Sequence, residues 1–163
     1  MTFKILSATF LQDGKHSFTL DFTQPESNSQ DCKFTLLIGK NGVGKSLILE
    51  AIIDFLLYVW VSYTMYSMVR RSKYIFCTTL IYYMNGAVCK LDWQEGSLHF
   101  YIDGDECSVL LDYLPRIVAT SFSICDKFKV PGSKEREQFH FYKYIGAKVN
   151  GNMISPTSIL FTL

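Results

Sequence analysis

The chain opens with two short segments that are rich in β-branched and aromatic residues, 3–11 and 16–22. Asp13-Gly14 separates them, and such a pair is typical of tight hairpin turns because both positions tolerate positive φ. We therefore predict two antiparallel strands here. The next apolar segment, 34–38, is almost wholly hydrophobic, which favours a strand buried on both faces.

A long helix is predicted from Lys45, because the residues from 45 to 64 include neither Gly nor Pro. Most of its positions are apolar, so we expect protein to cover most of its circumference. The polar residues recur every four positions and so form one stripe along the helix. That stripe consists of Glu50, Asp54, Tyr58 and Ser62.

The hydrophobic period changes in the middle third of the chain. Short apolar segments follow one another there, separated by dipeptides that end in glycine, which predicts an antiparallel meander. Beyond Pro115, the apolar residues 116–121 predict another strand. The meander segments are 78–84, 87–93, 97–102 and 107–111, and the turns are Asn85-Gly86, Glu95-Gly96 and Asp103-Gly104.

Composition indicates an ordered chain with no global attraction for polyanions. Hydrophobic residues make up 48% and aromatic residues 15% of the 163 positions, enough apolar surface to offset the entropy of folding. Sixteen Lys and Arg balance fifteen Asp and Glu, for a net charge of +1. Nucleic-acid binding is therefore not evident from charge.

Cysteine spacing and the lack of a leader predict a cytoplasmic protein without a membrane span. The five cysteines include no C-x-x-C pair, which indicates small buried side chains in a reducing compartment. The first residues lack the pattern of a secretion signal. The longest apolar stretch, 55–69, is shorter than a membrane-spanning helix requires.

One segment, the phosphate loop of residues 39–46, carries recognisable chemistry. It matches G-x-x-x-x-G-K-[ST] in full and lies between the predicted strand 34–38 and the predicted helix. Its glycines let successive N–H groups point inward, and the helix N-terminus adds partial positive charge. ATP and Mg²⁺ are the expected cofactors. The predicted ATP-binding residues are Gly39, Lys40, Asn41, Gly42, Val43, Gly44, Lys45 and Ser46.

Two residues of this loop have specific roles in the prediction. We expect the Lys45 ammonium to reach the β and γ phosphates, because a P-loop lysine provides a positive charge there. We expect the Ser46 hydroxyl to be a ligand of the Mg²⁺ ion that bridges them.

Hydrolysis also requires a carboxylate at the end of an apolar strand, to hold Mg²⁺. Residues 109–112 come nearest to this pattern and make Asp112 the candidate catalytic residue, although Tyr113 follows where a Glu is usual. Asp103 also follows apolar residues, but its position before glycine indicates a hairpin turn. The sequence does not identify the adenine contact, for which Phe10 is one candidate.

The phosphate loop and its surroundings resemble a known family. With two strands before it and Leu49-Glu50-Ala51-Ile52 and a meander after it, the loop is similar to lobe I of ABC-type ATPases of the SMC, RecF and Rad50 class. Later segments resemble a narrower group, the AAA family ATPases of bacterial anti-phage and retron systems, which include the Septu ATPase PtuA. Those segments are 115–121, 126–128, 142–146 and 153–155.

The resemblance implies an α/β fold of the P-loop NTPase type, with the β-meander beside a central strand-loop-helix unit. Residues 1–163 would form a single ATP-binding domain, lobe I, with lobe II absent from this chain. The resemblance also implies a homodimer or higher oligomer formed through the ATP sites, and a nuclease as partner protein.

The sequence departs from the family pattern at several motifs. It has no LSGG-like signature, and Ser121 and Ser123 stand where a Q-loop glutamine is common. We therefore expect these residues alone to bind Mg-ATP without turnover, with ATP hydrolysis requiring the complete assembly. A RecF- or Rad50-like DNA-repair ATPase, a small P-loop kinase acting on a metabolite, and a structural module that keeps the loop without turnover are the alternatives.

Overall fold

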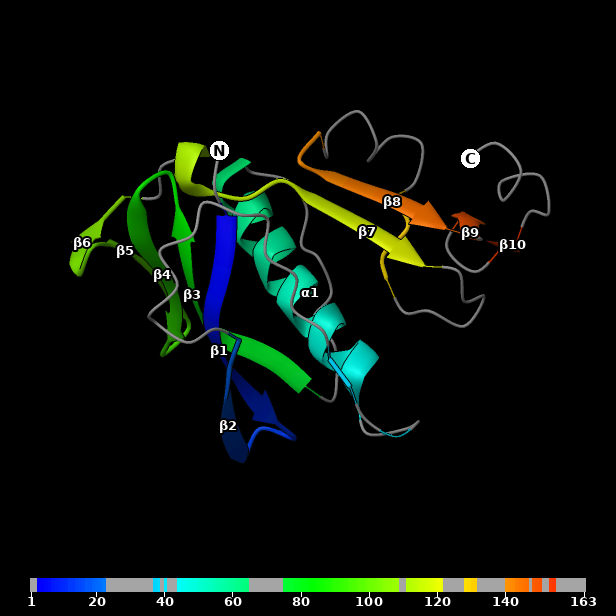
Figure 1. Cartoon of the computed structure of the whole chain (residues 1–163), viewed down its shortest axis with the longest axis horizontal. Coiled ribbons are helices and arrows are strands. Elements are labelled where there is room, and N and C mark those ends of the chain that lie inside the picture. The colour runs from blue at the N-terminus through cyan, green and yellow to red at the C-terminus, as the bar shows by residue number, and fades with distance from the viewer. Residues whose placement is uncertain are drawn as a thin grey trace. The chain divides into compact units, whose positions relative to one another are not determined.

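A six-stranded antiparallel sheet and one helix form the larger part of the described structure (Figure 1). The chain divides into two compact units, Met1–Pro115 and Arg116–Leu163. The prediction of one ATP-binding domain over 1–163 stays a prediction, because this division concerns packing alone. The computed structural model describes residues 3–22, 37–38, 40, 44–64, 75–108, 111–121, 128–131, 140–146, 148–150 and 153–154.

The sheet of the first unit has the strand order β2-β1-β3-β4-β5-β6, and every neighbouring pair is antiparallel. Its first two strands form the predicted N-terminal hairpin, which is confirmed. The strands are β1 (Phe3–Gln12), β2 (His16–Asp21), β3 (Ile75–Met84), β4 (Ala87–Gln94), β5 (Ser97–Ile102) and β6 (Asp105–Cys107).

Four tight turns connect these strands where the sequence predicts them. At each turn an acidic residue or asparagine precedes glycine, and both residues have positive φ, which matches the right-handed twist of the flanking strands. At the first turn, for example, Asp13 has φ 50° and Gly14 has φ 67°. The other turns are Asn85-Gly86, Glu95-Gly96 and Asp103-Gly104.

The last predicted meander strand, 107–111, is wrong in its bounds. The turn before it aligns Asp105 with Ile102, so the strand β6 begins at Asp105 and ends at Cys107. Leu111 belongs instead to a short 3-10 helix, η1 (Leu111–Tyr113).

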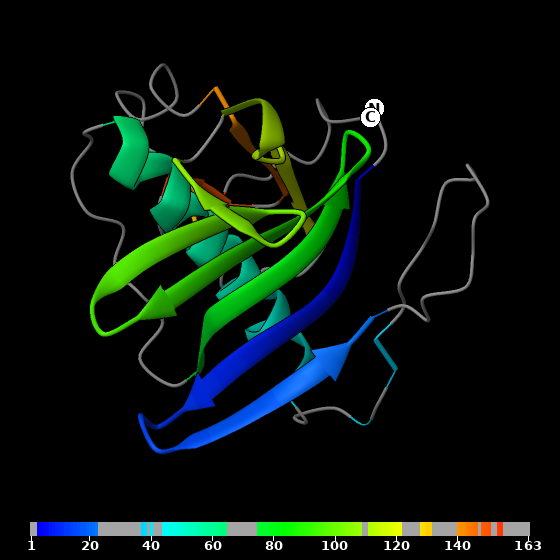
Figure 2. The same cartoon turned by 90° about the vertical axis from the view of Figure 1, so that its left-hand side faces the viewer.

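Helix α1 (Lys45–Thr64) confirms the helix predicted from the apolar pattern. It packs against one face of the sheet, and Figure 2 shows the opposite face with α1 behind the strands. The Tyr58 ring of α1 meets the Trp93 ring of β4 edge-on, with the centroids 5.1 Å apart. Completely buried side chains of the core between them include Phe10, Leu57, Leu80, Tyr82 and Leu91, each 0% exposed.

The predicted buried strand 34–38 is not found in its described part. Leu37 and Ile38 have no regular secondary structure, and Ile38 is 86% exposed. A strand buried on both faces needs neighbours that cover it, and Ile38 has no such cover. Residues 34–36 lie outside the described residues, so the P-loop NTPase fold stays a prediction.

Residues 111–115 are tied to the rest of the first unit by hydrogen bonds to their main-chain carbonyls. Tyr82 Oη donates to the carbonyl of Tyr113 at 2.8 Å, and Asn85 Nδ2 donates to that of Asp112 at 2.9 Å. From α1, the Trp60 indole N–H donates to the carbonyl of Pro115 at 3.1 Å. These bonds fix the segment at the end of the unit.

The second unit contains a parallel strand pair, β7 (Ile117–Ser121) and β8 (Tyr142–Gly146). The strand predicted at 116–121 is therefore confirmed. Ala119 and Phe141 are 3% and 1% exposed, so the unit has buried apolar residues of its own. A short antiparallel pair follows, β9 (Lys148–Asn150) and β10 (Met153–Ile154).

The structure also bears on the membrane prediction. Among the helices in the described part of the chain, none combines the length and apolar character that crossing a bilayer requires.

Candidate nucleotide-binding site

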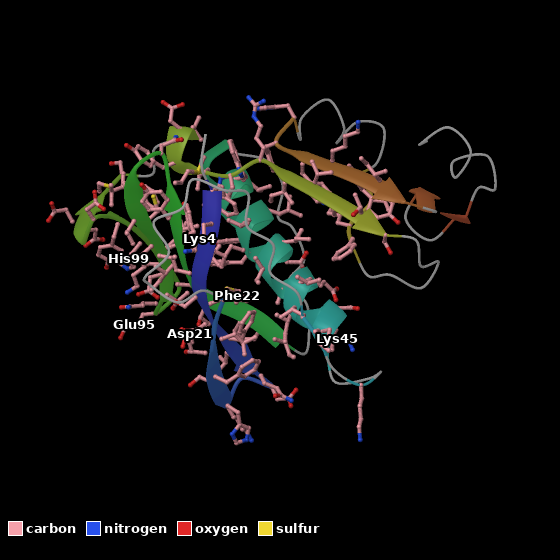
Figure 3. The ribbon with its side chains drawn as sticks, in the orientation of Figure 1. Lys4, Asp21, Phe22, Lys45, Glu95 and His99 are labelled. Atoms are coloured by element: carbon pink, nitrogen blue, oxygen red, sulfur yellow. The ribbon has the colours of Figure 1, made fainter. Side chains whose placement is uncertain are left out.

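The last three residues of the phosphate loop, 44–46, are described together with the start of α1. Figure 3 shows Lys45 at the N-terminal end of that helix. Lys40, Gly44, Lys45 and Ser46 are described. The other predicted ATP-binding residues, Gly39, Asn41, Gly42 and Val43, lie outside the described residues.

Gly44 is the residue at which the loop turns into the helix. Its φ is +91°, a conformation that side chains with Cβ rarely adopt, and its carbonyl accepts a 3.0 Å hydrogen bond from the N–H of Ile48. A Cβ at Gly44 would meet no heavy atom within 4 Å. Glycine is therefore required here by the backbone conformation rather than by space.

Lys45 folds back over the loop from the first position of α1. Its Nζ donates a hydrogen bond to the main-chain carbonyl of Lys40 at 2.8 Å. A cation at a helix N-terminus is unfavourable against the helix dipole, by roughly 0.3–1 kcal/mol at exposed sites. Such a local conflict is typical of functional positions.

The first turn of α1 contains Lys45 and no acidic side chain. The partial charge of the helix N-terminus and the Lys45 ammonium therefore add up at one end of the helix. This combination favours an anion, and the phosphates of a nucleotide fit it.

Ser46 follows Lys45 and is exposed, so its hydroxyl is open to a ligand. Mg²⁺ in nucleotide sites is usually held by one or two protein ligands together with phosphate oxygens and water. Within the described ranges, no group of three or more His, Cys, Asp or Glu residues could hold a metal ion.

The candidate catalytic carboxylate Asp112 lies in the 3-10 helix η1 and is exposed. This turn, closed by a 3.1 Å hydrogen bond from the N–H of Leu114 to the carbonyl of Leu111, differs from the strand end that the Mg²⁺ pattern requires. Residues 109 and 110 lie outside the described residues.

The alternative carboxylate, Asp103, lies in a hairpin turn as the sequence indicates. Its Oδ1 accepts a 2.8 Å hydrogen bond from the N–H of Val88, so the side chain ties this turn to the neighbouring strand β4.

Phe10 is completely buried and offers no surface for adenine, so this candidate is wrong. Its ring is 0% exposed and stacks on Phe18, with the centroids 5.2 Å apart and the planes at 21°. Of the two Q-loop positions, Ser121 ends β7 in the second unit, and Ser123 lies outside the described residues.

Sequence reasoning missed a polar cluster around Asp92 on the sheet face opposite α1. Asp92 is 4% exposed, and its carboxylate accepts hydrogen bonds from Thr79 Oγ1 at 2.8 Å and Gln94 Nε2 at 2.7 Å. Lys90 Nζ lies 2.6 Å from the same carboxylate. Burial raises the pKa of Asp92, but these donors together hold it below its usual value.

A sequence signal for this cluster existed. Lys90, Asp92 and Gln94 alternate along the predicted strand 87–93 and its end, so they share one face of the strand. Thr79 is the cross-strand partner of Asp92, which only the register reveals.

Cys77, Cys89 and Cys107 are free thiols in the described part of the chain. Burial raises the pKa of the Cys77 thiol to about 12 and that of the Cys89 thiol to about 11. Both thiols are therefore protonated at neutral pH and unreactive. Cys32 and Cys125 lie outside the described residues.

Comparison with known proteins finds no relative of this chain. No family model, curated protein or solved structure matches it. Its function therefore has to be inferred from its own residues.

Proposed function

We propose that the chain is the ATP-binding subunit of an SMC-like machine, with the phosphate loop as its nucleotide site. The observation that carries the proposal is the coincidence of the full G-x-x-x-x-G-K-[ST] motif with a helix that begins at the lysine of that motif. A chance match of the motif has no reason to fall at a helix start.

Local geometry supports the phosphate assignment. Gly44 has the positive φ that lets the loop curve into α1. The Lys45 ammonium lies against the loop, at 2.8 Å from the carbonyl of Lys40. Both features belong to an anion site at a helix N-terminus, where Mg-ATP would supply the phosphates and its own metal ion.

The biological setting that we propose is bacterial anti-phage defence in the cytoplasm, of the Septu or retron type. It rests on the sequence resemblance, together with the buried, free cysteines Cys77 and Cys89, which suit a reducing compartment. In that setting nucleotide binding would control assembly of a homo-oligomer and the action of a partner nuclease. A DNA-repair ATPase of the RecF or Rad50 kind would use the same site.

The alternative of a small metabolite kinase is less well supported. That class alternates strands with helices after the phosphate loop and needs a lid that carries arginine. The described residues 75–108 instead form four consecutive antiparallel strands. This order favours the ATPase proposal.

A calorimetric titration tests the proposed site. The chain is titrated with Mg-ATP, Mg-ADP and adenosine at one salt concentration. Because the positive end of α1 would recognise phosphates, we expect ATP and ADP to bind and adenosine to bind far more weakly. Adenosine affinity equal to that of ATP would remove the phosphate assignment.

Ser46→Ala tests the role of the metal in the same experiment. Loss of this hydroxyl removes one Mg²⁺ ligand, so the gain in ATP affinity that Mg²⁺ gives the wild type should shrink. Ser97→Ala, at the start of β5, serves as the matched loss of an exposed serine hydroxyl. An unchanged Mg²⁺ effect in Ser46→Ala would exclude Ser46 as the metal ligand.

A further inference from the structure

The two edge strands of the six-stranded sheet differ in how they are protected. Strand β6 has three residues, and two of them, Asp105 and Glu106, are acidic. Short, charged edge strands resist pairing with another chain. Strand β2 has six residues with neither Lys nor Pro, and its pairing with β1 shows no register shift.

The outward-facing backbone groups of β2 follow from its hydrogen bonds to β1. The N–H of Phe22 donates to the carbonyl of Leu6 at 2.8 Å. Residues that bond to a neighbouring antiparallel strand alternate with residues that face away. The backbone N–H of Phe22 points toward β1. The odd-numbered residues Ser17, Thr19 and Asp21 therefore point their N–H and C=O groups away from β1, to the open side of the strand.

This open side is exposed in the structure. Ser17, Thr19 and Asp21 are exposed, and β1 is the sole strand paired with β2 among the described residues. Figure 2 shows β2 at the rim of the sheet, and Figure 3 labels Asp21 at its end.

We propose that β2 is a dimerisation edge, which binds β2 of a second copy of this chain in an antiparallel arrangement with Thr19 on the two-fold axis. A two-fold axis places identical residues opposite each other at its centre. With Thr19 opposite Thr19, Ser17 of each copy pairs with Asp21 of the other. In the described part of the chain β2 pairs with β1 alone, so the outward N–H and C=O groups of these residues can each donate and accept a backbone hydrogen bond.

Side chains on both faces of the joined sheet are complementary in this register. On the face opposite α1, each Asp21 carboxylate faces a Ser17 hydroxyl of the other copy. On the face that carries α1, half-buried Phe18 of one copy lies opposite half-buried Leu20 of the other. Cross-strand pairs of these kinds stabilise an antiparallel ladder by roughly 0.2–1 kcal/mol each.

A threonine row also continues across the axis. Thr9 Oγ1 and Thr19 Oγ1 are 2.9 Å apart within one copy, and Thr9 is paired with Thr79 of β3. The second copy would extend this row by its own Thr19 and Thr9. The sequence of β2 thus suits pairing with itself, whereas the acidic strand β6 would place like charges opposite each other.

Disulfide trapping tests the register directly. In Thr19→Cys the two new thiols face each other across the axis, and Cα atoms of directly opposite residues are about 5.5 Å apart, within disulfide range. Under mild oxidation without nucleotide, we expect nearly complete conversion to a covalent dimer on a non-reducing gel. The wild-type chain shows how much covalent dimer the native cysteines form by themselves.

Ser17→Cys is the matched control, because it lies on the same strand and the same face. In the proposed register the two Ser17 residues are four positions apart along the ladder, about 13–14 Å, too far for a disulfide. Ser17→Cys should therefore form no more covalent dimer than the wild-type chain. Equal cross-linking of both variants, or none by Thr19→Cys, overturns the proposal.

Sedimentation velocity without added thiols provides the second measurement. The wild type should show a concentration-dependent dimer in the absence of nucleotide, and Thr19→Lys should sediment as a folded monomer because it places two ammonium groups on the axis. A dimer that appears with Mg-ATP alone would exclude the β2 edge and leave the nucleotide site intact. A β2 dimer that persists in Lys45→Ala would show that the two proposals are independent.

Discussion

The N-terminal end of helix α1 and the stretch from Ala51 to Val61 have opposite surroundings. At the N-terminal end Ser46 is exposed, and Leu49 is 42% exposed although it is apolar. Further along, the helix packs against β3, and its Trp60 side chain bonds to the carbonyl of Pro115. Its buried side chains there are Ala51, Ile52, Phe55, Leu56, Leu57, Val59, Trp60 and Val61.

This difference separates stability from binding along a single helix. Residues of the enclosed part determine how firmly α1 is held, while the exposed start bears the charge and hydroxyl that suit a nucleotide. A substitution at one end should therefore change one property and leave the other nearly intact. The following predictions test that separation, from the largest expected effect to the smallest.

Leu57→Ala should have the largest effect on stability. Leu57 is 0% exposed, and removing a large side chain at such a site leaves a cavity that lowers the free energy of unfolding by about 2–5 kcal/mol. Urea denaturation measures this change. Leu49→Ala, at the exposed end, is the control and should change the free energy of unfolding by roughly 0.5 kcal/mol or less. Equal losses in both variants would contradict the contrast between the two ends.

Lys45→Ala should reverse that result, with a large effect on binding and a small one on folding. Hydrogen bonds to a charged group contribute roughly 1.5–3 kcal/mol each, so ATP affinity should fall about ten-fold to over a hundred-fold. The free energy of unfolding should change little. Loss of the bond to the Lys40 carbonyl lowers it, and relief of the repulsion between the ammonium and the helix dipole raises it. Calorimetry and urea denaturation of one preparation measure both quantities. ATP affinity equal to that of the wild type would remove the site assignment.

Trp60→Phe should weaken the enclosed end without changing nucleotide affinity. The indole N–H donates to the Pro115 carbonyl at 3.1 Å in a buried place, so phenylalanine leaves that carbonyl without this donor. The expected loss is about 1–3 kcal/mol in the free energy of unfolding. If ATP affinity fell with stability in this folded variant, the two ends of α1 would not be separable.

Gly44→Ala should affect both properties moderately. Alanine at a φ of +91° is strained by about 1–2 kcal/mol, and relief of this strain would distort the loop that we propose binds phosphate. Gly86→Ala is a matched control, because Gly86 also has a φ of +91° and equally open surroundings but lies in the β3–β4 turn. Both variants should lose similar stability in urea, and ATP affinity should fall in Gly44→Ala alone.

The smallest effect concerns Asp92, far from α1 on the opposite sheet face. Its folded-state pKa lies below its value in the unfolded chain, near 3.9, so the ionised form stabilises the fold. That stabilisation is complete above the unfolded pKa and disappears as pH falls through the folded pKa. The stability difference between the wild type and Asp92→Asn should therefore narrow below about pH 4. Urea denaturation of both proteins at a series of pH values measures this difference. A difference that stays constant with pH would contradict the stabilising role of the ionised Asp92 carboxylate.

The regular elements of the first unit could be predicted because local signals agree there. Turn dipeptides such as Asn85-Gly86 fix both ends of their strands, and the mostly apolar segment from 45 to 64, without Gly or Pro, predicts the helix. The buried strand at 34–38 failed for the opposite reason. An apolar segment indicates burial, but Ile38 is exposed, and no local pattern reports whether neighbours cover a residue.

The candidate site was predictable only as far as its motif reaches. The eight residues of the phosphate loop are contiguous, so spacing alone finds them. Asp112 and Phe10 were inferred from single strands, and their surroundings depend on residues distant in the chain. The polar cluster of Asp92 likewise joins β3 and β4 through a register that sequence does not display.

The strand order also has a consequence for how the first unit folds. Strands β3 to β6 are joined by two-residue turns, and such hairpins form within about 1–10 μs. Strand β1, by contrast, must find β3 across the whole length of α1, with two irregularities in their ladder. Chain closure of that length is slow compared with hairpin formation. We therefore expect the meander to form first and the docking of the N-terminal hairpin to limit the refolding rate.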